Sequence, residues 1–345
     1  MARSGLGRRT ALGTTTLLIG ANLPDIDVLA YLDGPAADLS FRRGWTHGVP
    51  ALVVLPFLLT GAVVLFDRLV RRAGRAVLPS GVKPAQVLLL AVLSIVSHPI
   101  LDTLNTYGVR WLMPLRGDWY YGDTLFIVDP WVWLVLGVGV VTSRRPHGAR
   151  SHDPGATRPA RAALGLSLCY VLGMLISGVL SRGIARRELA ALGGPVERLM
   201  VAPLPLTPLV RQVVAVQGER YQVGTFRWLE TPHIASASLR SFPRPAPGDP
   251  LVEAARQQSL GRRFLGWARF PTMQTDTNAA GQVLVHLIDL RYADRPDAGF
   301  GSVTLRLPGG TGPLSSTSSY SGSAPPRRTP PSPAPPALGT PASSP

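Results

Sequence analysis

The stretch "RRGWTHGVPALVVLPFLLTGAVVLF" (residues 42–66) joins a short polar segment to a long apolar run. From Val49 to Phe66 the chain has no charged side chain, and about 18 such residues are enough for a helix to cross a membrane. His47 lies directly before this run, where the edge of the bilayer is expected. Ionisable side chains are costly beside lipid and usually have a function there. The stretch therefore predicts a membrane span with a polar site at its edge.

Other apolar runs predict further spans. Residues 84–101, 130–143 and 162–181 also lack aspartate, glutamate, lysine and arginine side chains. The run at 130–143 has an apolar approach from residue 125, but Asp129 and Pro130 interrupt it, so its start is the least defined. The threonine-rich run at 10–24 is shorter and is either a truncated span or a half-buried segment. We therefore predict four spans, or five if residues 10–24 also cross.

The composition supports a membrane protein and excludes several other classes. Hydrophobic residues make up 46% of the chain and charged residues only 16%, whereas about 25% charged residues is typical of soluble domains. The net charge of +15 comes almost wholly from arginine, since Lys83 is the only lysine. These arginines are not interleaved with aromatic residues as in nucleic-acid-binding motifs, so no nucleic acid is expected as a partner. Cys169 is the only cysteine, which excludes disulfides and thiolate metal sites, and we expect it to be a small buried hydrophobic residue.

The basic residues between the apolar runs predict an orientation. Positive residues in short loops favour the cytoplasmic side of a membrane. One such loop contains Arg68, Arg71, Arg72, Arg75 and Lys83, and another contains Arg144, Arg145, Arg150, Arg158 and Arg161. If both loops are cytoplasmic, the segments 25–47 and 102–123 lie on the opposite face. His47 and His98 are then expected near the outer interface of the membrane.

The chain changes character after residue 181. The runs "ERYQVGTFRWLE" (219–230), "GQVLVHLIDLRYAD" (281–294) and "GSVTLRLPGG" (301–310) alternate in part and end in turn residues, as strands do. Residues beyond Pro308 are mostly serine, proline and glycine, and such a composition buries too little surface to offset chain entropy. The fold class predicted is an α-helical multi-span membrane domain (1–183), then a small β-rich extracytoplasmic domain (184–308) and a disordered C-terminal tail (309–345).

Carboxylate and imidazole side chains are concentrated in the two segments predicted on the outer face. His98 and Asp102 are four residues apart, which places them on one face of a helix, although Pro99 must either begin or kink that helix. Carboxylate oxygen combined with imidazole nitrogen suits zinc, manganese or iron. A divalent metal at such a site lowers the pKa of bound water to about 7 and so produces a nucleophile. The candidate metal ligands are Asp25, Asp27, His47, His98 and Asp102.

Three further residues are candidates for catalytic roles. Arg43 could hold an anionic substrate such as a phosphate, or it could be an interfacial anchor together with Arg42. Asp123 and Asp129 could complete a metal shell, orient a histidine ligand or accept a proton.

Simpler roles are also open for several of these residues. Asp129 could simply begin a span, Asp25 and Asp27 could cap a helix or form a turn, and His98 could be a hydrogen-bonded histidine within the membrane. Four histidines lack partners at a useful spacing and are expected to be structural or solvated: His147, His152, His233 and His286.

Residues 22–141 resemble a family of bacterial inner-membrane proteins, the LexA-regulated, membrane-bound metal-dependent hydrolases. The resemblance rests on "NLPDID" (22–27), "RRGWTHG" (42–48), "SHPILDTLNTYG" (97–108), "LMP" (112–114) and "YGDTLFIVDPW" (121–131). It implies a multi-span membrane protein with a metal-dependent hydrolase site. By motif it implies the metal ligands Asp25, Asp27, His47, His98 and Asp102, with Asp123 and Asp129 as accessory residues.

Members of that family usually have a further Thr-His pair in an N-terminal apolar helix, ahead of a basic stretch like "GRRTALG" (7–13). This sequence begins at "MARSGLGRRT" without the pair, so we expect either a truncated start or a site with one ligand fewer.

Two functions remain open at this point. The first is a membrane-bound metal-dependent hydrolase that acts on phosphoester or lipid-linked substrates at the outer face of the inner membrane, with a divalent metal, zinc first, as cofactor. The second is a non-catalytic integral membrane protein whose Asp/His cluster is structural or ion-binding. A transporter is a weaker alternative because no inverted repeat is visible.

Overall fold

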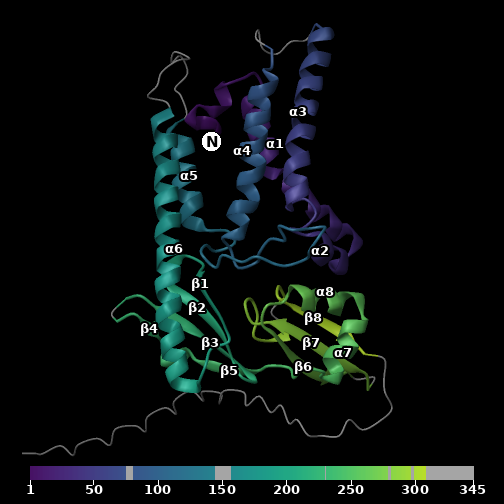
Figure 1. Cartoon of the computed structure of the whole chain (residues 1–345), viewed down its shortest axis with the longest axis vertical. Coiled ribbons are helices and arrows are strands. Elements are labelled where there is room, and N and C mark those ends of the chain that lie inside the picture. Colours follow the sequence, from purple (N-terminus) through teal and green to yellow (C-terminus); the bar gives the residue numbers. More distant parts are fainter. Residues whose placement is uncertain (75–80, 144–156, 230, 279–280, 297–298, 308–345) are drawn as a thin grey trace, which may run out of the picture. The chain divides into compact units, whose positions relative to one another are not determined.

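Apolar helices form the first part of the chain in a computed structural model (Figure 1). The structure describes residues 1–74, 81–143, 157–229, 231–278, 281–296 and 299–307, which belong to one unit, Met1–Pro308. The predicted tail at 309–345, His147 and His152 lie outside the described residues.

Among the described residues, three helices are long and apolar enough to cross a membrane: α3 (Val49–Arg72), α4 (Pro84–Thr103) and α6 (Arg158–Gly193). They confirm the spans predicted at 49–66, 84–101 and 162–181.

The other two predicted spans form shorter helices. The run at 130–143 forms α5 (Pro130–Thr142), which has 13 residues and is shorter than the three candidate spans. The run at 10–24 forms α1 (Gly13–Asn22), a helix of 10 residues. It is followed by the 3-10 helix η3 (Leu23–Asp33) and by α2 (Pro35–Phe41). Shorter 3-10 turns are η1 (Ala2–Ser4), η2 (Leu6–Arg8) and η5 (Ser236–Ser238).

Proline marks the start of each long apolar helix. Helices α3, α4, α5 and α6 all carry a proline in their first turn, where a missing N–H group costs nothing and the fixed φ angle favours helix. Pro99 is different because it lies inside α4, which continues to Thr103. His98 and Asp102 therefore remain one turn apart on the same helix.

Helix α4 packs between α1 and α3. The buried side chains between α3 and α4 are Leu59, Val63, Val87, Ala91 and Ile95. Elsewhere the apolar helices expose much of their surface, and only 17% of the most apolar window of α3 is buried. Cys169 is exposed on α6, so the expectation of a buried cysteine was wrong. A helix that is apolar on all sides gives no periodic signal of which face turns inward.

Two antiparallel sheets follow α6 and confirm the predicted β-rich part (Figure 1). The first sheet has the order β1-β2-β3-β4, with β5 also paired to β3. Its strands are β1 (Arg198–Leu204), β2 (Thr207–Gln217), β3 (Arg220–Arg227), β4 (His233–Ile234) and β5 (Arg240–Pro243). The second sheet has the order β6-β7-β8, with β6 (Pro271–Thr277), β7 (Val283–Asp289) and β8 (Ser302–Arg306).

Helices join these sheets to the rest of the chain. The last turns of α6 contribute the buried Ala185 and Leu189 to the core of the first sheet, so this helix continues past the predicted domain boundary at residue 183. The second sheet packs against α7 (Pro250–Gln257) and α8 (Ser259–Trp267). Tyr107, from the segment after α4, belongs to the same core. The boundary at 183/184 itself stays a prediction.

A substitution at Gly20 tests the packing of α1 on α4. A Cβ atom at this position would overlap the Ser94 side chain, so Gly20→Ala should destabilise the protein by about 1–3 kcal/mol although alanine favours helix more than glycine. Thermal unfolding in detergent measures the effect. The control is Gly61→Ala in α3, where a Cβ atom meets nothing within 4 Å and stability should hold or rise slightly. Equal stability of Gly20→Ala and the wild type would contradict the packing described.

Candidate metal centre

Four of the predicted ligands meet at one point. Asp25 comes from η3, His47 from the turn before α3, and His98 and Asp102 from α4. One ligand atom from each lies within 4.8 Å of all the others. Nε2 of His98 is 3.3 Å from Asp25 Oδ1 and 3.5 Å from Asp102 Oδ2, and His47 Nε2 is also 3.5 Å from Asp102 Oδ2. This group can hold a metal ion.

The turn before α3 is held tightly, which fixes His47. The Gly48 N–H donates to the Gly44 carbonyl at 2.7 Å, and the Val49 N–H donates to the Trp111 carbonyl at 2.9 Å. A Cβ atom at Gly44 would lie only 2.7 Å from a guanidinium nitrogen of Arg110. Glycine at 44 therefore allows Arg110 to approach the turn and to donate to the carbonyl of Arg42 at 2.9 Å.

Each histidine uses its Nδ1 atom for a contact outside the group. His98 Nδ1 lies 2.7 Å from the Ala21 carbonyl, to which it donates, and this assigns the lone pair to Nε2. His47 Nδ1 lies 3.3 Å from Asp27 Oδ2 and 3.1 Å from Thr46 Oγ1. Histidine ligands of metals commonly have such an outer partner, which sets their tautomer and orientation.

Asp27 lies behind His47 and is not one of the four grouped ligands. Its Oδ2 atom accepts hydrogen bonds from the Arg43 N–H at 2.7 Å and from Thr46 Oγ1 at 3.1 Å. The side chain is only 3% exposed. The structure thus places Asp27 where a carboxylate can orient the imidazole of His47.

The ligand atoms themselves are buried and unsatisfied. Within the described part of the chain, His47 Nε2, His98 Nε2 and Asp102 Oδ2 have no hydrogen-bond partner. Buried polar atoms almost always have one, because leaving them unpaired costs about 1–3 kcal/mol each. All three atoms converge within the same group, and one cation between them would satisfy them together. The residues therefore fit a metal ion.

Arg43 orients the carboxylate of Asp102 toward the other ligands. Its Nη2 atom donates to Asp102 Oδ1 at 3.1 Å, which leaves Oδ2 for the centre of the group. Its Nη1 atom donates to Asn105 Oδ1 at 3.0 Å, and its guanidinium lies 4.7 Å from the centre of the Tyr107 ring. The structure thus places Arg43 against a ligand, whereas its contact with a substrate stays a prediction.

Asn105 and Thr46 were not among the predicted site residues. Asn105 Oδ1 also accepts the Tyr107 N–H at 2.9 Å, so this one atom fixes both the arginine and the turn after α4. Both residues stand inside the short motifs around His47 and Asp102, and this nearness is the only signal in the sequence that could have indicated them.

The electrostatics of the group favour a cation. Burial lowers the pKa of His47, but its contacts with Asp102 and Asp27 outweigh burial, so the pKa lies above the ordinary value. The close approach of His98, whose Nε2 atom lies 3.3 Å from Asp25 Oδ1, is the largest cause of a lowered pKa at Asp25. Both shifts arise because carboxylates and imidazoles lie close together. A proton or a metal ion is therefore needed to balance the two ligand carboxylates.

Asp123 and Asp129 lie outside this group and have other partners. Both carboxylate oxygens of Asp123 accept from Arg269 Nη1, at 2.9 and 2.8 Å. Asp129 Oδ1 caps α5 by accepting the N–H groups of Trp131 and Val132 at 3.1 Å, and Tyr170 donates to its Oδ2 at 3.2 Å. The structure does not bring either residue to the four ligands, and Asp129 begins a helix.

His286 and His233 also lie outside the four ligands. His286 Nδ1 lies 2.8 Å from Thr304 Oγ1, and His233 contacts the Thr231 carbonyl.

The β-rich part holds the segment that contains Asn105. Arg291 Nη1 donates to the Thr106 carbonyl at 2.7 Å, and its Nη2 donates to the Trp267 carbonyl at 3.0 Å. Thr106 Oγ1 also lies 3.1 Å from the Tyr292 hydroxyl. Residues far along the chain thus brace the turn behind Asp102.

A family model described as YdjM inner membrane protein matches residues 1–183. The chain belongs to this family. It is also similar to the uncharacterized protein YfhP of Bacillus subtilis (strain 168), with 24% identity over 285 residues, which cover 81% of this chain and 76% of the relative. No solved structure matches it. The matched region contains the four grouped ligands, the candidate spans α3 and α4, and α6 up to residue 183. The protein is therefore a membrane protein with a possible metal site, and the family description names no reaction.

Asp123 can be tested as a structural residue. Asp123→Asn leaves the partly buried Arg269 without the buried carboxylate it pairs with and should destabilise the protein by about 3 kcal/mol, while metal content stays unchanged. The control is Asp118→Asn, because Asp118 pairs with Arg116 at an exposed site where such pairs contribute about 0–1 kcal/mol. Chemical unfolding and metal analysis measure the two properties. A loss of metal in Asp123→Asn without loss of stability would instead indicate an accessory role at the site.

Proposed function

We propose that this protein is a membrane-bound metal-dependent hydrolase, with Asp25, His47, His98 and Asp102 as ligands of a divalent metal ion. The observation that carries the proposal is the convergence of three buried, unpartnered ligand atoms in the group. Two imidazole nitrogens with carboxylate oxygens suit zinc best, with manganese and iron as alternatives. When bound, such an ion supplies Lewis-acid activation of water and of a phosphoryl group at neutral pH.

The open side of the group indicates how a substrate arrives. The Asp25 side chain is 56% exposed, whereas that of His47 is completely buried. A substrate therefore approaches past Asp25, while Asp27 and Arg43 hold the buried ligands from behind. Arg43 also places a positive charge beside the ligands, which favours an anionic group such as a phosphoester.

Exposed apolar side chains in the segments that adjoin the ligands along the chain support a lipid-linked substrate. Ile26, Leu29 and Leu32, which follow Asp25 in η3, are 51%, 58% and 82% exposed. Leu115, in the segment after α4, is 85% exposed. The adjoining α3 is a candidate span, so these residues suit contact with the bilayer surface. We propose that this opening and the β-rich part lie on the extracytoplasmic side, which the basic loops between the spans support.

A structural metal site is the second candidate. Structural zinc sites usually have four protein ligands, whereas catalytic sites usually have three and keep one position open. The four grouped ligands join η3, the turn before α3 and α4, as a structural ion would. The exposure of Asp25 favours the catalytic alternative, because a closed structural site has no need of an accessible ligand.

Metal content and turnover distinguish these two functions. Purified wild-type protein should contain a divalent metal, and His98→Ala should weaken its binding more than about 100-fold, since even outer partners of ligands contribute about 10–100-fold. His286→Ala is the matched control because His286 bonds to Thr304 outside the group. Metal analysis after dialysis measures binding. Equal metal content in His98→Ala and the control would contradict the site.

The same proteins in lipid nanodiscs then report on catalysis. A long-chain alkyl phosphoester should be hydrolysed by the wild type and by His286→Ala, and turnover should stop with chelator or in His98→Ala. Retained metal without turnover of long-chain or short-chain phosphoesters would favour the structural role.

Asp27→Asn tests whether this residue orients His47 or binds the metal itself. If Asp27 orients His47, the substitution should weaken metal binding about 10–100-fold, because His47 loses its carboxylate partner at 3.3 Å. The cobalt-substituted variant should keep the visible absorption spectrum of the cobalt-substituted wild type once saturated. A changed spectrum at saturation would mean that the ligand set has changed, and Asp27 would then be a ligand.

A further inference from the structure

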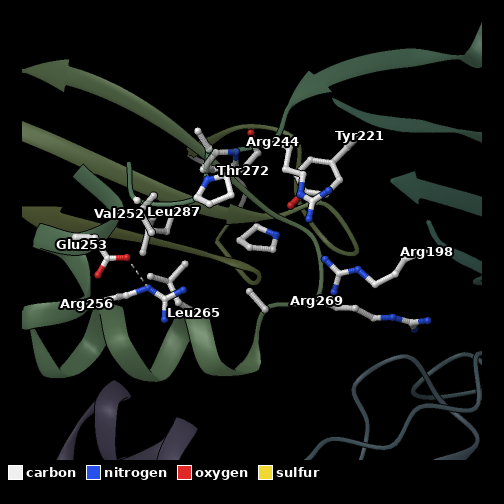
Figure 2. Close-up of a pocket in the computed structure, with 16 residues that line it drawn as sticks. Arg198, Tyr221, Arg244, Val252, Glu253, Arg256, Leu265, Arg269, Thr272 and Leu287 are labelled. Atoms are coloured by element: carbon white, nitrogen blue, oxygen red, sulfur yellow. Dashed lines mark ion pairs between the residues drawn. The ribbon is translucent and has the colours of Figure 1, made fainter. Parts of the chain in front are cut away.

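A second candidate site lies in the β-rich part, in a cleft between the first sheet and the helix-covered second sheet (Figure 2). Its cavity has a volume of about 300 Å³. Arg198 and Tyr221 line it from β1 and β3, and Val252 and Leu265 line it from α7 and α8. None of its lining residues belongs to the metal-binding group.

The cleft carries an excess of positive charge. Four arginines line it, against one carboxylate, that of Glu253. Three of the arginines have acidic partners, in the pairs Arg244–Glu197 at 2.8 Å, Arg256–Glu253 at 3.5 Å and Arg269–Asp123 at 2.8 Å. The Arg198 side chain has no hydrogen-bond or ion-pair partner among the described residues. Its only ring contact there is with Phe270, at 5.8 Å from the guanidinium to the ring centre.

Tyr221 adds a hydroxyl group to the positive side of the cleft. It is 2% exposed, and burial raises the pKa of its phenol, so the group stays protonated and can donate a hydrogen bond. Arg198 and Arg244 line the same cavity as Tyr221, and their positive charges oppose that shift. Two guanidinium groups and one hydroxyl offer more donors than a single carboxylate needs, and they suit the three terminal oxygens of a phosphate monoester.

The other side of the cleft combines apolar side chains with the Arg256–Glu253 ion pair. Val252, Leu265 and Leu287 come from α7, α8 and β7, and Figure 2 shows them on the left of the view, with Arg198, Arg244 and Tyr221 toward the right. A ligand that fills the cavity therefore meets unpaired donors at one end and, at the other, hydrocarbon next to an ion pair whose charges balance. The volume is at the low end of the roughly 300–1,000 Å³ of ligand sites, so the apolar portion is short.

We propose that this cleft binds a small amphiphilic anion, a phosphate monoester joined to a short apolar chain. The unpaired Arg198 and the hydroxyl of Tyr221 recognise the phosphate, and Val252, Leu265 and Leu287 contact the chain. The site is separate from the metal-binding group and does not depend on the proposed hydrolase activity.

Titration of the full-length protein in lipid nanodiscs tests the site, with hexyl phosphate as the probe and calorimetry as the measurement. A chelator is present throughout, so that a metal ion cannot provide the binding. Hexyl phosphate should bind saturably, and at least about tenfold more tightly than either 1-hexanol or inorganic phosphate. Equal binding of hexanol would overturn the role of the arginines, and equal binding of inorganic phosphate would overturn the role of the apolar wall.

Variants locate the binding. Arg198→Gln should weaken hexyl phosphate binding about tenfold or more, since a charge-assisted hydrogen bond is lost. The matched control is Arg227→Gln, an exposed arginine of β3 outside the cleft, which should change the affinity less than about twofold. If Arg198→Gln does not fold, Arg198→Lys keeps the charge and should weaken binding by a smaller factor. Unchanged affinity in every folded Arg198 variant, or an equal loss in Arg227→Gln, would overturn the proposal.

Discussion

The contact of Arg291 with the Thr106 carbonyl is the interaction on which the rest of the structure depends. Arg291 and Asp289 form an ion pair at 2.7 Å with both side chains completely buried. Burying a charge costs several kcal/mol unless its hydrogen bonds are satisfied. Here the guanidinium bonds to Asp289, Thr106 and Trp267 and lies 4.7 Å from the centre of the Trp267 ring. The buried ion pair is therefore stable only when the segment after α4 supplies the Thr106 carbonyl to the guanidinium.

That requirement reaches the metal-binding group through three consecutive contacts. Thr106 follows Asn105, whose Oδ1 atom holds Arg43, and Arg43 in turn holds Asp102 Oδ1. The segment between α4 and α5 has little regular structure of its own, with one isolated bridge between Val109 and Tyr120. Its shape therefore comes from tertiary contacts. A ligand held in this way keeps its orientation without a metal ion, so little reorganisation is needed when an ion binds.

Sequence reasoning identified the long spans and the core of the site because both rest on local patterns. An uncharged run of 18 residues indicates a helix in lipid, and the spacing of His98 and Asp102 places them on one face of α4. Sequence reasoning could not tell that Asp25 belongs to the grouped ligands and that Asp27 lies behind His47. These residues lie in a 3-10 helix with three residues per turn, so positions two apart point to different sides, one toward the ligands and one behind His47.

Asp123 and Asp129 show where local patterns give no information. The partner of Asp123 is Arg269, 146 residues away, and no spacing rule connects the two. Asp129 before Pro130 has the pattern of a helix start, and equally that of a polar residue at a site, so only its contacts distinguish the two.

The metal-binding group and the packing of the helices around α4 depend on one another. The three unpaired ligand atoms penalise the folded chain, and a bound cation removes that penalty. An ion that binds the folded chain and not the unfolded one stabilises it by RT ln(1 + [M]/Kd), about 2.7 kcal/mol at 100 times Kd. The stabilised elements are η3, the turn before α3 and α4. Arg43 holds Asp102 of α4, and Arg291 holds Thr106 in the segment that follows this helix. Metal binding and the contact of Arg291 with Thr106 should therefore strengthen each other, because both hold Asp102 in the same orientation.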